Sequence, residues 1–311
     1  MRNITKLILA AAIAATLAGG VSLVRLDLDP VALEARYATP PSRFVVVDGV
    51  RFHVRDRGAG PAIVLVHGQS ANLFSWEAWA EDLQEDHRVI SLDLPGHGLT
   101  GPDPQSRYSW ADLAEGIDRL TTELGIDRFV LAGNSLGGAV AVSYALAHGD
   151  RLDALVLLDA IGAPRDEPKP LIFELYAAPV IGQAITVITP EWMVRASLES
   201  TYGNPTLVTD ADVTSFSDLM RRAGNREAAR QIVSQPYDPA IPARIGELSV
   251  PVLLMWGGRD SWVAPKYAHW YDTHLPNADL VIFPELGHMP MSEAPAPTLA
   301  ALRRFLAQIA A

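Results

Sequence analysis

The sequence contains no cysteine among its 311 residues. This absence excludes disulfide bonds, a thiolate nucleophile and cysteine-ligated metals, and it leaves the redox compartment open. Positive charge is also scarce, because 36 acidic residues outnumber 25 lysines and arginines and give a formal net charge of -11. Nucleic acid and anionic lipid headgroups are therefore not expected as main partners.

Charge is missing altogether from one stretch near the N-terminus. Arg2 and Lys6 precede residues 7–24, LILAAAIAATLAGGVSLV, which carry no charged side chain. As a helix this stretch would be roughly 27 Å long, just short of a bilayer core of about 30 Å. The flanking positive charge also fits a secretory signal, with Ala18 as a cleavage point. We expect residues 1–26 to be a signal peptide or a membrane anchor, with the rest outside the cytoplasm.

The remainder has neither repeats nor low-complexity segments, and 49% of all residues are hydrophobic, so a large folded core is expected. Asp48-Gly49 separates two apolar runs, a hairpin signal. Further buried-strand patterns are PAIVLVHG, HRVISLDLPGHG, RFVLAGN, LDALVLLDA, PVLLMWGGRD and ADLVIFPELGH. Helical patterns lie between them, the last over Leu299 to Ile309. This alternation predicts an α/β fold with a mostly parallel twisted sheet covered by helices on both faces.

The chain divides by composition. Residues 27–41 resemble a polar, proline-containing linker. Residues 162–236 contain helical stretches and no clear strand pattern, which predicts a helical cap inserted between core segments 42–161 and 237–311. We expect the apolar side chains of the cap to face a substrate pocket: Leu171, Ile172, Phe173, Leu175, Tyr176, Val180, Ile181 and Ile185.

A serine lies between a strand pattern and a helix pattern in VLAGNSLGGAVAVSYALAHG. Gly133 and Gly137 flank Ser135 as G-x-S-x-G, so the strand can turn sharply into the helix without a side-chain clash. The serine is then strained and exposed above the sheet, and the helix N-terminus favours negative charge there. The alternative is a tight turn in which the serine only caps the helix.

A serine nucleophile needs a base, an orienting acid and an oxyanion hole. Asp260 and His288 each follow a strand pattern, and the order Ser135, Asp260, His288 is the one that such a site requires. Gln69 follows another strand, where a backbone N–H can act together with that of Leu136. Asp159 is the rival candidate for the acid.

Together these segments resemble the α/β-hydrolase family, in its esterase-like and carbon-carbon hydrolase-like branch. The resemblance rests on HGQSANLFSW, DLPGHGLT, GNSLGG, GGRDSWV and LGHMP, and it covers nearly all of the chain after residue 26. It implies Ser135 as nucleophile, His288 as base, Asp260 as acid, oxyanion-hole amides at Gln69 and Leu136, and a cap that shapes the pocket. It implies no cofactor and no metal.

Other conspicuous residues are expected to be structural. His67, His97 and Asp93 should order loops, and Asn134 should pack beneath the serine. Trp76, Trp79 and Trp262 are candidates for the pocket mouth, with core packing as the alternative. The histidines without metal-ligand spacing are expected to be solvated: His53, His87, His148, His269 and His274.

The residues leave the reaction open, since one fold hosts many chemistries. Hydrolysis of a small to medium, mostly apolar carboxylic ester is the expected activity, with a small molecule as the partner. Two enzymatic alternatives are carbon-carbon bond hydrolysis of aromatic ring-fission products and cofactor-free perhydrolysis. The carbon-carbon hydrolases typically have a glycine-rich loop where this chain has Gln69, and often a tryptophan where it has Met289. A non-catalytic binding protein is the alternative from another class.

Overall fold

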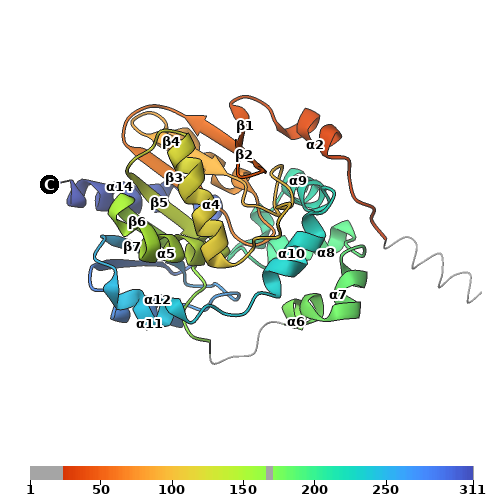
Figure 1. The fold of residues 1–311 in the computed structure, drawn as a ribbon. Coiled ribbons are helices and arrows are strands. Elements are labelled where there is room, and N and C mark those ends of the chain that lie inside the picture. Colours follow the sequence, from red (N-terminus) through yellow and green to blue (C-terminus); the bar gives the residue numbers. More distant parts are fainter. Residues whose placement is uncertain (1–23, 166–170, 311) are drawn as a thin grey trace, which may run out of the picture.

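The computed structural model describes residues 24–165 and 171–310, and its centre is an eight-stranded sheet (Figure 1). The strand order is β1-β2-β4-β3-β5-β6-β7-β8. The strands are β1 Ser42–Val47, β2 Val50–Arg57, β3 Ala62–Val66, β4 Arg88–Leu92, β5 Phe129–Asn134, β6 Leu152–Leu158, β7 Val252–Gly257 and β8 Ala278–Phe283. Strand β2 runs antiparallel to β1 and β4, and every other pair is parallel. The predicted mostly parallel sheet is confirmed.

Helices bury both faces of this sheet. Along β3, Val64 and Val66 pack into one apolar cluster, while Ile63 and Leu65 pack into the other. The first face is covered by α4 Trp110–Glu123, α5 Leu136–His148, α11 Ala240–Arg244 and α12 Lys266–His274; the second is covered by α3 Glu77–Leu83, α13 Pro290–Glu293 and α14 Pro295–Ile309. A strand buried on both faces is apolar throughout, which explains the unbroken hydrophobic runs.

Local sequence sets the turns and the helix ends. Asp48 (φ 48°) and Gly49 (φ 81°) both adopt the positive φ that a two-residue hairpin turn requires. Helix α4 begins with a capping box in which Ser109 and Asp112 satisfy each other's backbone N–H. Short 3-10 turns at Leu73–Trp76, Gly149–Arg151, Pro205–Leu207 and Ile245–Glu247 complete the connections. The closing helix begins at Pro295, earlier than expected, because proline suits the first turn.

The segment between β6 and β7, which we call the cap, contains helices and, in its described residues, no strand. Its helices are α6 Leu171–Ala177, α7 Pro179–Ile185, α8 Glu191–Glu199, α9 Asp210–Met220 and α10 Asn225–Val233. Two stretches that read as single helices are broken, one at Pro179 and one at Gly224. Proline offers no N–H to continue a helix, and Gly224 has a φ of 89°.

Residues 27–41 are not the linker that their composition suggested. They contain helix α2 (Pro30–Tyr37), which Asp29 caps and which buries Leu33. The segment just before α2 is bound to the cap: the Leu28 N–H donates to the Arg221 carbonyl at 2.7 Å. Hydrogen bonds of this kind order the segment and satisfy its backbone groups.

The predicted leader falls mostly outside the described residues. Residues 1–23 are not among them, so the expectation of a signal peptide or an anchor stays a prediction. Among residues 24–165 and 171–310, no helix has both the length and the apolar character needed to cross a membrane.

Candidate active site

Ser135 occupies a strained turn between β5 and α5. Its backbone has φ 55° and ψ -114°, a conformation that costs energy for a residue with a side chain. The Ser135 N–H donates to the Leu158 carbonyl at 3.0 Å, which fixes the turn against β6. The strained backbone therefore places Ser135 at the point where strand and helix meet.

The two flanking glycines are required by the close approach of backbone segments. A Cβ on Gly133 would lie 2.2 Å from the Gly137 carbonyl oxygen. A Cβ on Gly137 would lie 2.3 Å from the Val66 carbonyl oxygen at the end of β3. Any larger residue would push α5 away from the sheet.

His288 and Asp260 come together at the carboxyl ends of β7 and β8. His288 Nδ1 lies 2.7 Å from Asp260 Oδ2, and both side chains are buried. The other carboxylate oxygen accepts from the backbone N–H groups of Trp262, at 2.7 Å, and Val263, at 3.0 Å. The loop that carries Asp260 thus holds Oδ1, while Oδ2 faces the imidazole. The His288 carbonyl accepts from Asn134 Nδ2 at 3.0 Å.

Asp159, the rival candidate for the acid, is a direct neighbour of Asp260 and His288. It follows β6 with a φ of 46°, and it is fully buried. Functional atoms of Asp159, Asp260 and His288 all lie within 4.8 Å of one another. Burial, followed by the nearby charge of Asp260, raises the pKa of Asp159 well above its ordinary value. Asp260, not Asp159, makes the 2.7 Å contact with the imidazole.

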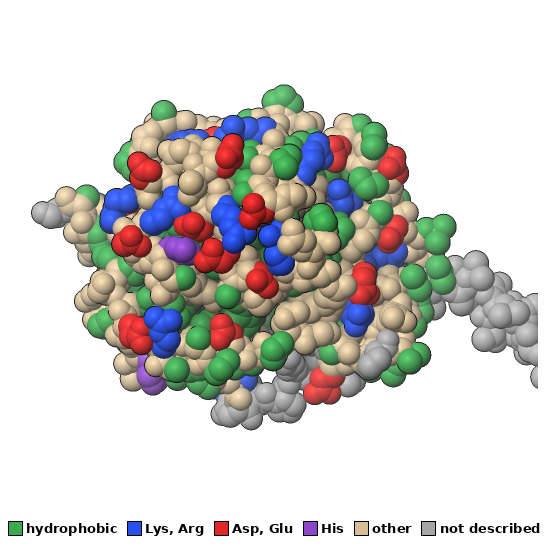
Figure 2. All heavy atoms as spheres, in the orientation of Figure 1, with side chains coloured by type: hydrophobic (Ala, Val, Ile, Leu, Met, Phe, Trp, Pro, Cys, Tyr) green, Lys and Arg blue, Asp and Glu red, His purple; other side chains and the backbone are tan. Residues whose placement is uncertain are grey.

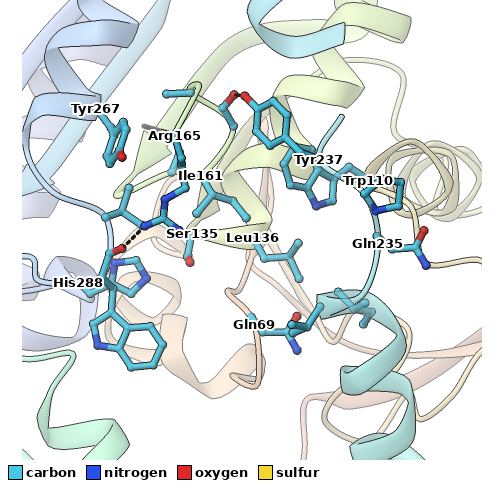
Figure 3. A pocket seen from close by; sticks show the side chains of 18 residues that line it. Gln69, Trp110, Ser135, Leu136, Ile161, Arg165, Gln235, Tyr237, Tyr267 and His288 are labelled. Atoms are coloured by element: carbon cyan, nitrogen blue, oxygen red, sulfur yellow. Dashed lines mark hydrogen bonds between the residues drawn. The ribbon is translucent and has the colours of Figure 1, made fainter. Parts of the chain in front are cut away.

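Two pockets meet at Ser135, and Gln69 and His288 line both of them. Figure 3 shows Ser135 and His288 next to each other, with Leu136 and Gln69 on the other side of the serine. Leu136 is the first residue of α5, and the first N–H groups of a helix have no intrahelical acceptor. The predicted positions of the oxyanion-hole amides are thus beside the serine.

The pocket on the cap side is the larger, at about 220 Å³, and we call it the cap-side pocket. Its walls are mainly apolar and come largely from α8, α9 and α10: they include Met193, Val194, Leu198, Phe216, Met220 and Ala229. The second pocket, of about 150 Å³, lies between α4 and the loops after β6 and β7. It is more polar, with Trp110, Tyr237, Tyr267 and Arg165 in its wall, and we call it the core-side pocket.

Only part of the expected inward-facing apolar set lines a pocket. Tyr176 faces the cap-side pocket, but Val180 is 80% exposed and Ile181 is 50% exposed. The expectation was wrong for these two residues, because α7 lies at the outer edge of the cap and presents them to solvent. The side chains of Leu171, Ile172, Phe173 and Ile185 lie outside the described part of the structure.

One cation at the site was missed by sequence reasoning. Arg165 lines the core-side pocket and donates to the Trp262 carbonyl at 2.8 Å (Figure 3). It lies in an irregular loop after β6, where no periodicity marks the direction of a side chain. The arginines of the cap are engaged elsewhere, for example Arg226 with Asp27 at 2.5 Å.

Two other expectations about aromatic and histidine residues need correction. Trp76 is fully buried against Trp79 and the second face of the sheet, and it lines neither pocket; Trp262 lines both. His53 is buried rather than solvated, because β2 is paired on both sides within the sheet. Its ring nitrogens contact Asp93 Oδ2 at 2.7 Å and Ser42 Oγ at 2.9 Å.

Asp93 orders the loops as expected. It accepts from the backbone N–H of Leu73 and of Leu99, both at 2.8 Å. His67 accepts from the Leu94 N–H at 3.1 Å through Nε2. Burial, and then the neighbouring His67, lowers the pKa of His97 to about 3, so that ring is neutral. These groups support the loop after β3 that carries Gln69.

The mostly parallel sheet carries a serine at a strand-to-helix turn, with an acid and a histidine after later strands. This is the arrangement of an α/β hydrolase. A family model described as alpha/beta hydrolase fold matches residues 61–295. The chain belongs to this family.

Curated relatives cover most of the chain. It is 25% identical to 2-hydroxy-6-oxo-6-phenylhexa-2,4-dienoate hydrolase of Burkholderia cepacia over 79% of this chain and 90% of that protein. It is 26% identical to pimeloyl-[acyl-carrier protein] methyl ester esterase of Nitrosomonas europaea over 78% and 94%. The structure of a bacterial membrane phospholipase A matches with a TM-score of 0.76 and 26% identity, covering 99% of this chain and 98% of that one. The relatives thus include both ester and carbon-carbon hydrolases.

Proposed function

We propose that this hydrolase cleaves a small to medium, mostly apolar carboxylic ester through an acyl-enzyme on Ser135. The observation that carries the proposal is the meeting of two pockets at Ser135, next to a histidine held by a buried carboxylate. One pocket can receive the acyl part and the other the alcohol part, so the ester bond lies over the hydroxyl. A binding module has no need of this arrangement.

The proposed reaction assigns one task to each group. Ser135 Oγ attacks the ester carbonyl while His288 Nε2 takes its proton. Asp260 lies 2.7 Å from His288 Nδ1. It accepts the Nδ1 proton, holds the ring in place and stabilises the imidazolium. The N–H groups of Gln69 and Leu136 stabilise the oxyanion. His288 then protonates the leaving alcohol, and water attacks the acyl-enzyme by the same route.

The apolar cap-side pocket is assigned to the acyl chain. Each methylene buried there contributes about 0.8 kcal/mol, or roughly a fourfold gain in kcat/KM, until the pocket is full. A series of neutral p-nitrophenyl esters is therefore expected to show specificity that rises over several carbons and then falls. Phe216→Ala, in the wall of this pocket, moves the optimum to longer chains.

The half-buried Phe44 in β1 lines neither pocket, so Phe44→Ala is the matched control and leaves the chain-length optimum in place. Specificity that never falls with length, or that Phe216→Ala leaves unchanged, contradicts a closed acyl pocket. Absence of any ester hydrolysis contradicts the proposed function itself.

Carbon-carbon hydrolysis is retained as a second candidate because of Arg165. A carboxylate left without a partner is strongly disfavoured in an apolar pocket. Arg165 supplies a partner at the rim of the core-side pocket, and two relatives act on oxo-dienoates by name. Parallel assays with carboxylate-bearing esters and vinylogous diketones decide between the two candidates. A clear preference for the carboxylate-bearing substrates that is lost in Arg165→Met favours carbon-carbon hydrolysis. Perhydrolysis is assayed by adding peroxide to the same series of substrates.

A further inference from the structure

Several large apolar side chains are exposed together at the edge of the cap. Val180 and Ile181 on α7 are 80% and 50% exposed, and Trp192 on α8 is 64% exposed. Val187 lies between these helices, and Val24 and Leu26 lie at the beginning of the described chain. We call these six residues the cap-edge surface.

Backbone contacts join the two parts of this surface. Val24 pairs with Ile188 in an antiparallel bridge, and the Arg25 N–H donates to the Val187 carbonyl at 2.8 Å. Figure 2 shows apolar side chains gathered on this side of the molecule, near the place where the described chain begins. Large apolar side chains gathered on one side of a surface favour a partner there.

The adjoining sequence indicates which partner fits. Residues 7–24 carry no charge, and this stretch ends at Val24, within the surface itself. The formal net charge of -11 argues against attraction to anionic headgroups, so an apolar contact is the remaining driving force. Tryptophan favours the boundary between lipid and water. We propose that the cap-edge surface docks on a lipid bilayer, with Trp192 in the interfacial region.

The same segment also forms a wall of the proposed acyl pocket. Val187 and Trp192 are exposed, while Ile188, Thr189 and Met193 between and beside them line the cap-side pocket. Docking would therefore place that pocket next to the bilayer. This points to an ester whose acyl chain resides in a membrane as the substrate class, a step that rests on the proposed esterase function.

The first test follows Trp192 in the full chain reconstituted into phosphatidylcholine vesicles. Of the seven tryptophans, Trp192 alone is in the exposed class, so quenchers attached to lipid chains report on it. We expect quenching in the wild type that persists at high salt and disappears in Trp192→Leu. Val180→Asp is expected to lower vesicle affinity, and with it the quenching, at least about tenfold, because the exposed valine that docking would bury in lipid is replaced by a charge.

Val46→Asp is the matched control, since Val46 is 65% exposed on β1 outside this surface. Activity is measured in parallel on a long-chain ester in the vesicles and on a soluble short-chain ester. Val180→Asp should lower only the former. Unquenched Trp192, equal effects of the two aspartates, or a shift from dimer to monomer in lipid-free Val180→Asp would each overturn docking. A wild type inactive on both esters would instead reject the esterase function, while quenching still reports docking.

A second inference concerns Asp159 and stands on a separate observation. Asp159 Oδ1 accepts from the Gly257 N–H at 2.9 Å, but the buried Oδ2 has no hydrogen-bond partner among the described residues. Its neighbours are the carboxylate of Asp260 and the ring of His288, with Glu293 as a further acid. Two carboxylates this close do not both ionise readily.

We propose that Asp159 is a positioning residue: as a neutral acid it donates a hydrogen bond to Asp260 and limits the charge that Asp260 presents to His288. Burial and the Asp260 charge raise the pKa of Asp159, in keeping with a protonated acid. Loss of this donor would strengthen the acceptor facing His288, favour the imidazolium and move the acid limb of kcat/KM to higher pH.

The test compares Asp159→Leu with Asp159→Asn, whose amide can still donate. We expect the acid limb to move to higher pH in the leucine variant and to stay near the wild-type position in the asparagine variant. If Asp159 were ionised, both substitutions would remove a negative charge and move the limb to lower pH. If its role were only structural, both would lower thermal stability without moving the limb. Either result overturns the proposal.

Discussion

Ser135→Ala is expected to abolish ester hydrolysis while the protein stays folded. In a serine hydrolase the nucleophile, base and acid act as a unit, and removal of the nucleophile costs on the order of a million-fold in kcat. His288→Ala should cost about as much, and the double variant should be little worse than either. The measurements are kcat on a p-nitrophenyl ester, circular dichroism and the stoichiometry of labelling by a fluorophosphonate.

The strained backbone at Ser135 calls for a matched control. Ser106 has a φ of 53°, against 55° for Ser135, but it is exposed in the loop before α4 and lines neither pocket. Ser106→Ala reports the cost of changing a serine in this conformation, and it should leave kcat within about twofold of the wild type because surface changes away from a site are usually mild. A folded Ser135→Ala that kept more than about a hundredth of the activity would contradict the covalent mechanism.

The core of the fold was predictable because its signals are local. Runs such as AIVLV in β3 are apolar at every position, which is what burial on both faces of a parallel sheet demands. Gly133 and Gly137 indicate the turn at Ser135, because a Cβ at either position would clash with the neighbouring backbone. The order of serine, acid and histidine then follows from the order of the strands.

Expectations failed where burial depends on distant contacts. Residues 27–41 were interpreted as a linker, yet α2 is ordered by Leu33 and by backbone bonds of the preceding residues to the cap. His53 looks like a surface histidine, but Asp93, forty positions later, satisfies its ring inside the sheet. In the cap, Val180 and Ile181 have the composition of a pocket wall, and only the placement of α7 shows that they face solvent.

Asp159 and Asp260 show a finer limit of sequence reasoning. Each follows a buried strand, so spacing alone cannot decide which one holds His288. The loop after β7 decides it, because the N–H groups of Trp262 and Val263 hold one oxygen of Asp260 and turn the other toward the imidazole. Asp159 instead uses Oδ1 for Gly257 in the adjacent strand.

Asp260→Asn is expected to lower kcat by about ten-thousand-fold with little change in fold, as happens when a triad aspartate becomes an amide. The asparagine oxygen can still accept from Trp262 and Val263, so its NH₂ replaces the oxygen at 2.7 Å from His288 Nδ1. Nδ1 must then accept, the proton moves to Nε2, and the ring cannot take a proton from Ser135. The measurement is kcat at neutral pH, with proton NMR of the ring to assign the tautomer.

The exposed Asp272 on α12 offers the control, because Asp272→Asn makes the same chemical change far from the pockets. Asp159→Asn distinguishes the two acids, since it leaves the contact between Asp260 and His288 in place and keeps a donor beside Asp260. Its loss should therefore be far smaller than that of Asp260→Asn. The reverse order, with the ring tautomer changed only in Asp159→Asn, would make Asp159 the triad acid and reject the assignment of Asp260.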